Sequence, residues 1–346
     1  MEIIIGLFII AIGAFCQSSC YVPINKIKGW SWESYWLVQG IFAWLVLPFL
    51  GALLAVPEGQ SLFNLFATTD SFHMWMTILF GVLWGVGGLT FGLSMRYLGV
   101  ALGQSIALGT CAGLGTIMGP VLLNIFFPEL NALSSLTFAV IFGVVVTLVG
   151  IAIIGIAGKM KADSLSQGDN QTAIKDFNFP KGIAIALLSG FMSGCFNVGL
   201  EFGKDINFGD LTNPMFKTLP ATFLVTLGGF VTNALYCFYQ NQKNHTWNDY
   251  KKGKVWGNNV LFCALAGALW YSQFFGLSLG KGFLTSSPTL MTLAFCVLMS
   301  LNVVFSNVWG IILKEWQGCS RKTIYVLVLG IIVLIISSFL PQLMAC

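Results

Sequence analysis

The chain has 346 residues, of which 56% are hydrophobic and 9% charged, and its mean hydropathy is +0.83. Soluble globular proteins carry about a quarter charged residues, so this composition excludes a water-soluble fold. The formal net charge of +4 is then no indication of nucleic acid binding. We expect an all-α integral membrane protein.

Ten apolar segments follow one another along the chain. A membrane-spanning helix needs about 20 mostly apolar residues, whereas a barrel strand needs about ten, so the lengths predict a helix bundle. The first segment has Glu2 as its only early charge and lacks a clear cleavage site, so we read it as a span and not as a signal peptide. The predicted spans are 3–24, 32–56, 72–95, 101–126, 136–158, 181–203, 217–239, 256–279, 287–313 and 323–343.

The basic residues divide unevenly between alternate loops. All of the 17 lysines and arginines except Lys204, Lys217 and Lys281 fall in loops on one side. The positive-inside rule places that side in the cytoplasm. We therefore expect a multi-pass protein of the cell inner (plasma) membrane, with an even number of spans and both termini on the outer face.

A polar stretch at 159–180 divides the chain into two halves of five spans each, 1–158 and 181–346. We expect this stretch to be a flexible cytoplasmic linker. The halves echo each other in TFGLSM at 90–95 and FFGLSL at 274–279. Because five is odd, a repeat of this kind would enter the membrane upside down. Two inverted five-helix repeats are typical of secondary transporters that work by alternating access.

Glycines and cysteines in the spans have plain structural explanations. Gly81, Gly85, Gly88 and Gly92 share one helix face, which indicates either close packing or a moving interface. Most of the nine cysteines fall within apolar spans, with no CxxC pair and no histidine nearby. We therefore expect them to be small apolar fillers, and we expect no metal site and no cofactor.

Four short motifs, taken together, resemble one known family. They are WSWE at 30–33 after Pro23, MRYLG at 95–99, LWYSQFF at 269–275 and LKEW at 313–316. In these motifs, span order and length, the chain is similar to the L-rhamnose–proton symporters of the drug/metabolite transporter superfamily. The resemblance implies ten helices in two inverted halves and proton-driven uptake of L-rhamnose.

A proton symporter needs a carboxyl group that titrates at the membrane, and Glu33 in WSWESYW is the first candidate. Burial among aromatic rings disfavours its charged form. The alternative is that Ser31 caps the helix and Glu33 stabilises the helix dipole. Glu201 is the second candidate for proton coupling, and its alternative is an ion pair with Lys204.

A sugar site needs aromatic rings against the apolar face of the sugar and polar groups for its hydroxyls. Buried amides also form hydrogen bonds between membrane helices, and this alternative stays open for each amide. Arg96, at the end of the third span, is either a gate residue or a snorkelling side chain. The predicted substrate-binding residues are Gln17, Gln39, Trp84, Asn197, Trp270, Tyr271 and Gln273.

The expected partners are L-rhamnose or a related 6-deoxy sugar, protons and the lipid bilayer, with no nucleic acid and no obligate protein partner. A membrane enzyme is not expected, because the spans hold no aspartate pair, no mid-span histidine and no metal-ligand cluster. The alternative function is a carrier of another sugar or small metabolite, acting as an exporter or without proton coupling.

Overall fold

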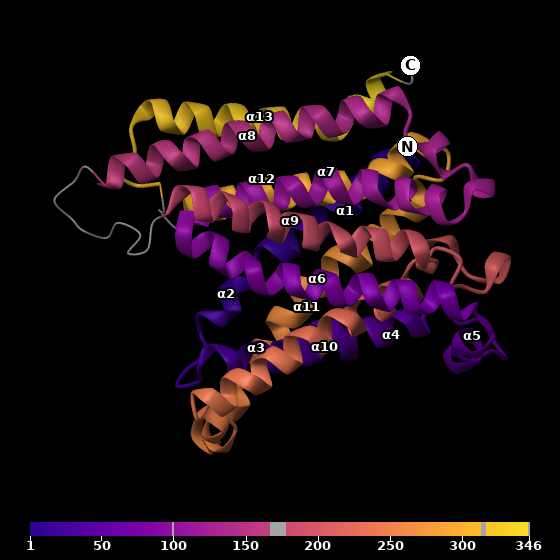
Figure 1. Ribbon diagram of the computed structural model, residues 1–346, viewed down its shortest axis with the longest axis horizontal. Coiled ribbons are helices and arrows are strands. Elements are labelled where there is room, and N and C mark those ends of the chain that lie inside the picture. Colours follow the sequence, from indigo (N-terminus) through magenta and orange to yellow (C-terminus); the bar gives the residue numbers. More distant parts are fainter. Residues whose placement is uncertain (99, 167–177, 313–315, 345–346) are drawn as a thin grey trace. The chain divides into compact units, whose positions relative to one another are not determined.

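The computed structural model describes residues 1–98, 100–166, 178–312 and 316–344, and every regular element in these ranges is a helix (Figure 1). Within this part of the chain, nine helical segments are long and apolar enough to cross a membrane. The chain is therefore a multi-pass membrane protein. The tenth predicted span coincides with helix α13 (Arg321–Met344), and its crossing of the membrane stays a prediction.

The helices form two compact units, each of which draws on both halves of the sequence. The predicted inverted relation between the halves stays a prediction. The first unit comprises Met1–Gly85 and Gly199–Phe283, and the second comprises Val86–Val198 and Leu284–Cys346.

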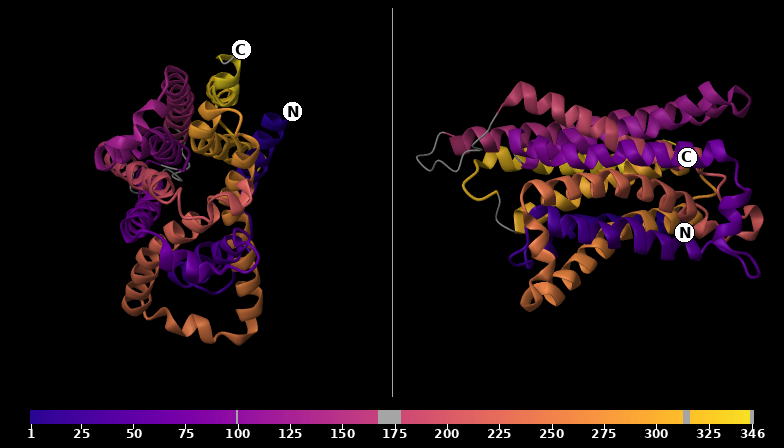
Figure 2. Two further views of the ribbon diagram at one scale, coloured as in Figure 1. Left: turned by 90° about the vertical axis from the view of Figure 1, so that its right-hand side faces the viewer. Right: turned by 60° about the horizontal axis from the view of Figure 1, so that its bottom comes forward.

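The first unit holds the N-terminal spans together with α10 and α11, which Figure 2 shows joined at one end by η6. Helix α6 (Ser71–Leu98) begins in this unit and continues into the second. The other elements of the first unit are α1 (Glu2–Ser18), α2 (Tyr21–Ile24), α3 (Trp32–Gly40), η1 (Ile41–Val46), α4 (Leu47–Leu53), α5 (Leu62–Thr68), η4 (Gly209–Leu211), η5 (Pro214–Phe216), α10 (Leu219–Lys243), η6 (Thr246–Lys251) and α11 (Gly253–Phe283).

Small residues bring these helices close together, as membrane helices commonly require. A Cβ atom on Gly13 of α1 would lie 2.9 Å from a carbonyl oxygen of α11, and one on Gly81 of α6 would lie 2.2 Å from a carbonyl oxygen of α10. Gly85 is similarly crowded, whereas a Cβ on Gly88 or Gly92 would meet no described atom within 4 Å. The predicted glycine face is thus a close-packing surface only at Gly81 and Gly85.

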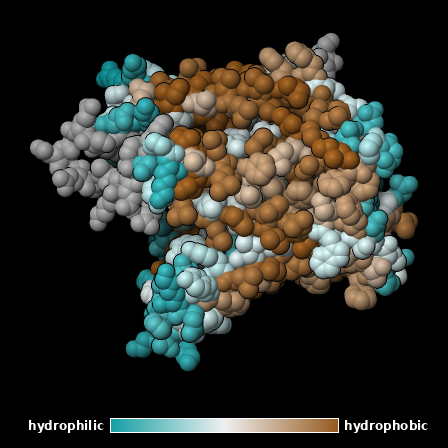
Figure 3. All heavy atoms as spheres, in the orientation of Figure 1, coloured by the Kyte–Doolittle hydropathy of each residue, from teal (hydrophilic) through white to brown (hydrophobic). Residues whose placement is uncertain are grey.

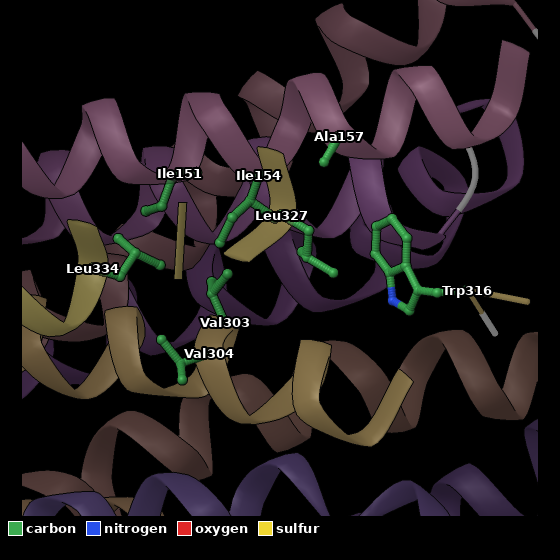
Figure 4. Packing of buried hydrophobic residues seen from close by; sticks show 8 residues of the cluster. All are labelled: Ile151, Ile154, Ala157, Val303, Val304, Trp316, Leu327 and Leu334. Carbon is green, nitrogen blue, oxygen red and sulfur yellow. The ribbon is translucent and has the colours of Figure 1, made fainter. Parts of the chain in front are cut away.

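In the second unit, α8, α12 and α13 contribute buried residues to an apolar cluster, which Figure 4 shows with Leu327 between Ile154 and Trp316. Helix α8 continues past residue 159 to Ser166, so the first residues of the predicted linker are helical. Lys161 there lies over the ring of Trp316, 4.7 Å from its centroid. The elements are α7 (Val100–Phe126), η2 (Pro128–Leu130), η3 (Ala132–Ser135), α8 (Phe138–Ser166), α9 (Phe179–Phe202), α12 (Pro288–Ile312) and α13.

The exposed side chains along the middles of the helices are apolar, and polar side chains gather near the helix ends (Figure 3). This distribution suits contact with lipid, because lipid solvates apolar side chains and water solvates the ends. The cysteines agree with their predicted role as apolar fillers, because six of them are buried: Cys20, Cys111, Cys195, Cys237, Cys263 and Cys296.

Candidate functional site

The second membrane span is not a continuous α-helix. Between α3 and α4 the backbone makes a π-helical turn, η1, which contains Trp44. Such turns are rare in helices and occur frequently at functional sites. Trp44 is only 4% exposed and lies against Gly40, where a Cβ atom would come within 2.6 Å of the indole. This turn could not be predicted from the sequence, because its residues, IFAWLV, are ordinary apolar residues.

Trp44 is the centre of a group of four indoles, Trp36, Trp44, Trp84 and Trp270, here called the tryptophan cluster. Its ring centroid lies 5.6 Å from that of Trp36, 6.0 Å from that of Trp84 and 5.9 Å from that of Trp270, each edge-on. Trp84 and Trp270 also contact each other at 5.6 Å. The four rings come from α3, η1, α6 and α11, so the cluster joins three membrane spans of the first unit.

Three polar atoms on these helices are buried and have no hydrogen-bond partner among the described residues. They are Gln39 Oε1, Trp44 Nε1 and the hydroxyl of Tyr271. A buried polar group without a partner costs about 1–3 kcal/mol. By contrast, Trp36 Nε1 donates to Asn233 Oδ1 at 3.0 Å. Gln39 lies on α3 and Trp44 in η1, and the Tyr271 hydroxyl from α11 lies against Gly51 of α4.

The first unit contains six of the seven predicted sugar-binding residues, which lie on α1, α3, α6 and α11: Gln17, Gln39, Trp84, Trp270, Tyr271 and Gln273. It also contains Trp44, which was not predicted as a binding residue because its position depends on the π-helical turn. Trp84 lies against α10, where a Cβ on Gly229 would be 2.1 Å from the ring.

The predicted amides other than Gln39 differ in their surroundings, and two of them donate hydrogen bonds to backbone carbonyl oxygens. Gln17 is half-buried on α1. Gln273 Nε2 donates to the carbonyl oxygen of Trp270 at 3.1 Å. Asn197 belongs to the second unit, where its Nδ2 donates to the carbonyl oxygen of Gly115 at 2.7 Å. The hydrogen bond of Asn197 is the interhelical kind that the sequence left open as an alternative.

Glu33, in the first turn of α3, is 5% exposed. Its Oε1 accepts hydrogen bonds from Asn244 Nδ2 and from Thr246 Oγ1, both at 2.9 Å. Among the described residues it has no cationic partner. Burial disfavours the ionised form of this carboxylate, whereas the two donated hydrogen bonds stabilise it.

Ser31 occupies the N-cap position of α3 but does not cap it with its side chain. Its backbone N–H donates to Asp249 Oδ2 at 2.8 Å, and its hydroxyl donates to the same oxygen. The predicted serine cap is therefore wrong, because the carboxylate of Asp249 takes the hydroxyl instead. Asp249 comes from η6, which the sequence placed in an ordinary loop.

Asp249 is 5% exposed and is the most heavily bonded carboxylate among the described residues. Its other donors are Ser34 Oγ at 2.9 Å and Lys252 Nζ at 2.6 Å, and Lys252 also donates to the carbonyl oxygen of Gly29. Burial by itself raises the pKa of the Asp249 carboxyl. The hydrogen bonds from Lys252 and Ser31 outweigh burial and lower its pKa to about 2.

Glu201 and Arg96 lie on α9 and α6. Glu201 is half-buried near the end of α9 and interacts electrostatically with Lys281 of α11, a partner that sequence reasoning did not pair with it. Its carbonyl oxygen accepts from the backbone N–H of Lys204 at 3.4 Å. Arg96 lies in α6, but its side chain is outside the part of the chain that the structure describes.

Comparisons with known proteins bear on this arrangement. The family model described as L-rhamnose-proton symport protein matches residues 1–345. The chain belongs to this family. It is 30% identical over 343 residues to the L-rhamnose-proton symporter of Yersinia pestis (strain Pestoides F), covering 97% of this chain and 96% of the relative. It is 31% identical, over the same shares, to the L-rhamnose-proton symporter of Enterobacter sp. (strain 638).

Membership of this family confirms the family predicted from the four motifs. The match spans both compact units and both halves of the sequence. It places the chain among transporters and not among membrane enzymes, which agrees with the prediction from the polar residues of the spans.

Proposed function

We propose that the chain is a secondary active transporter that carries L-rhamnose into the cell together with protons. The observation that carries this proposal is the match of the symporter family over residues 1–345. The two relatives named above are both L-rhamnose-proton symporters. No observation favours the alternative, a carrier of another sugar or small metabolite, over this reading.

We further propose that the tryptophan cluster contributes to the sugar site. L-rhamnose has hydroxyl groups for Gln39 Oε1, Trp44 Nε1 and the Tyr271 hydroxyl, which are buried without partners among the described residues. Its methyl group and ring hydrogens suit the faces of Trp84 and Trp270, which are both half-buried. The sugar would replace missing hydrogen bonds and so gain affinity.

Glu33 is the proposed proton-coupling residue. Its burial and its place at the start of a membrane span support this role. Glu201 is the second candidate, and it interacts electrostatically with Lys281 of α11. Alternating access between two inverted five-helix repeats is the proposed transport cycle.

The proposed location is the inner (plasma) membrane, with both termini outside. The uneven division of lysine and arginine supports this orientation. In the first unit the loop at 25–31 meets the start of α11, since Asn259 Oδ1 accepts from the backbone N–H of Lys28 at 3.0 Å. Basic loops separated by many spans therefore share one end of that unit, as the orientation requires.

Uptake of labelled L-rhamnose into proteoliposomes of the purified full-length protein tests the proposal. We expect accumulation above the external concentration only with an inward proton gradient, and competition by unlabelled L-rhamnose. Glu33→Gln is expected to exchange L-rhamnose across the membrane but to accumulate none. Equilibration of the wild type without accumulation would contradict proton coupling, and stronger competition by another sugar would support the alternative carrier.

A further inference from the structure

Two buried carboxylates, Glu33 and Asp249, lie at the two ends of a continuous path of polar contacts. Thr246 Oγ1 lies 2.9 Å from Glu33 Oε1 and 3.0 Å from Asn241 Oδ1. Ser34 Oγ lies 3.2 Å from the same amide oxygen and 2.9 Å from Asp249 Oδ2. All of these distances suit hydrogen bonds, so the protonation of one carboxylate is connected to the hydrogen bonding of the other.

The amide of Asn241 fixes the direction of this path. Asn241 is completely buried, and its Nδ2 donates to the carbonyl oxygen of Cys237 at 2.8 Å and approaches the Tyr250 hydroxyl at 3.4 Å. Its Oδ1 is therefore an acceptor for hydroxyl groups on both sides. The assignment of the amide nitrogen and oxygen follows from this network. If the two atoms were exchanged, Oδ1 would face the carbonyl oxygen of Cys237, and neither atom could donate.

The hydroxyl protons on the path suffice for its hydrogen bonds both when Glu33 is ionised and when it is protonated. When Glu33 is ionised, Thr246 donates to Glu33 and Ser34 donates to Asn241, because each hydroxyl has one proton. When Glu33 is protonated, its O–H donates to Thr246 and Thr246 donates to Asn241. The hydroxyl of Ser34 is then released to Asp249. No acceptor on the path loses its donor in either state, and a fully satisfied polar network is stable when buried.

We infer that Thr246 and Asp249 are positioning residues that set the pH at which Glu33 takes up its proton. The inference rests on the proposed role of Glu33 in proton coupling. Thr246 stabilises the ionised form of Glu33 by donating to it. Asp249 opposes that form through its own negative charge, which lies close enough to interact with Glu33.

The charged and titratable neighbours of Glu33 agree with this division of roles. Tyr35 from α3, Cys237 from α10 and Asp249 from η6 interact with it electrostatically. Lys252 is bound to Asp249 at 2.6 Å and thereby offsets part of its charge. The path joins the start of α3 to the turn between α10 and α11, so proton uptake by Glu33 changes the hydrogen bonds that hold these helices together.

The pH dependence of labelled L-rhamnose binding to the purified full-length protein, from about pH 5 to about pH 9, tests the inference. Binding is expected to fall as Glu33 loses its proton. Thr246→Val removes a donor to the ionised carboxylate, so its midpoint moves to higher pH by about one unit. Asp249→Asn removes a negative charge, so its midpoint moves to lower pH by a similar amount.

Matched controls separate this effect from a general loss of structure. Thr68→Val removes an exposed hydroxyl that binds only its own helix, and Asp210→Asn removes an exposed carboxylate, so neither moves the midpoint. Shifts of opposite sign in the two test variants support the inference. If Asp249→Asn does not fold, the shift of the pH midpoint in Thr246→Val alone tests the inference.

Two results would overturn the inference. If the wild type accumulates L-rhamnose but Thr246→Val and Asp249→Asn have the same pH midpoint as the wild type, Thr246 and Asp249 do not act on proton uptake. The proposed function would still stand. A wild type that binds no L-rhamnose at any pH would overturn the proposed function and this inference with it.

Discussion

The ring of Trp44 meets the ring of Trp84 edge-on, with centroids 6.0 Å apart and an interplanar angle of 87°. Each ring lies against a glycine, Trp44 against Gly40 and Trp84 against Gly229. Edge-on contact is a preferred geometry of aromatic rings, and it contributes about 0.5–1.5 kcal/mol beyond burial. The arrangement of the cluster therefore depends on two positions where no side chain fits.

Gly229→Ala tests this dependence. The new methyl group would overlap the Trp84 ring, so the ring must move and the apparent KM for L-rhamnose uptake is expected to rise about tenfold. Gly257→Ala on α11 is the control, because a Cβ there meets no described atom within 4 Å. An unchanged KM in Gly229→Ala would argue against a role of Trp84 in sugar binding.

Trp44→Phe keeps an aromatic ring in the π-helical turn but removes the buried N–H. If this group binds a sugar hydroxyl, the affinity for L-rhamnose falls about tenfold or more, as titration of labelled sugar will show. Trp75→Phe is the matched control, since Trp75 is 68% exposed on α6. Equal affinities of the two variants would place the sugar away from Trp44.

The charge of Asp249 gives a pH dependence of stability. Its pKa is about 2 in the folded chain, below the ordinary value near 3.8. A carboxyl whose pKa is lowered by folding stabilises the fold above its ordinary pKa, and this contribution is lost as pH falls toward 2. We expect Asp249→Asn to lower the free energy of unfolding by about 2 kcal/mol at neutral pH.

Thermal unfolding in detergent checks this expectation. The difference between wild type and Asp249→Asn should be constant from about pH 5 to about pH 8, and should shrink as pH falls below about 4. A difference that grows on acidification would contradict the assignment of an ionised, hydrogen-bonded Asp249.

Packing in the second unit gives a test that is independent of the sugar. Ile154 of α8 is completely buried, whereas Ile156, two residues on, is 55% exposed. Ile154→Ala is expected to destabilise the protein by about 2–4 kcal/mol, because it leaves a cavity against α13. Ile156→Ala should cost much less in the same denaturant titration, and equal losses would contradict the observed packing of α8 on α13.

The positions of the membrane helices could be predicted well from the sequence. Apolar runs of about 20 residues leave little choice, because backbone polar groups in lipid must be satisfied within a helix. The predicted span 72–95 corresponds to α6 (Ser71–Leu98), and 287–313 corresponds to α12 (Pro288–Ile312). The continuation of α8 to Ser166 was not predicted, because the residues after 158 are polar and were assigned to a linker. Charged residues are tolerated where a helix leaves the membrane.

The candidate site was predictable only in part. Buried amides and rings stand out by residue type, which led to Gln39, Trp84 and Trp270. Trp44 and Asp249 did not stand out, because their roles depend on contacts with distant segments. The position of Trp44 depends on a π-helical turn that its apolar neighbours do not predict. Asp249 is buried only because η6 folds back onto the start of α3.

The movement of protons with sugar tests the central claim most directly. L-rhamnose is added outside lightly buffered proteoliposomes that contain the purified protein and have no imposed gradient, and the external pH is recorded. Our prediction is that L-rhamnose alone makes the external solution more alkaline, and that Glu33→Gln abolishes this response. Entry of labelled L-rhamnose into wild-type vesicles with no change in external pH would contradict it.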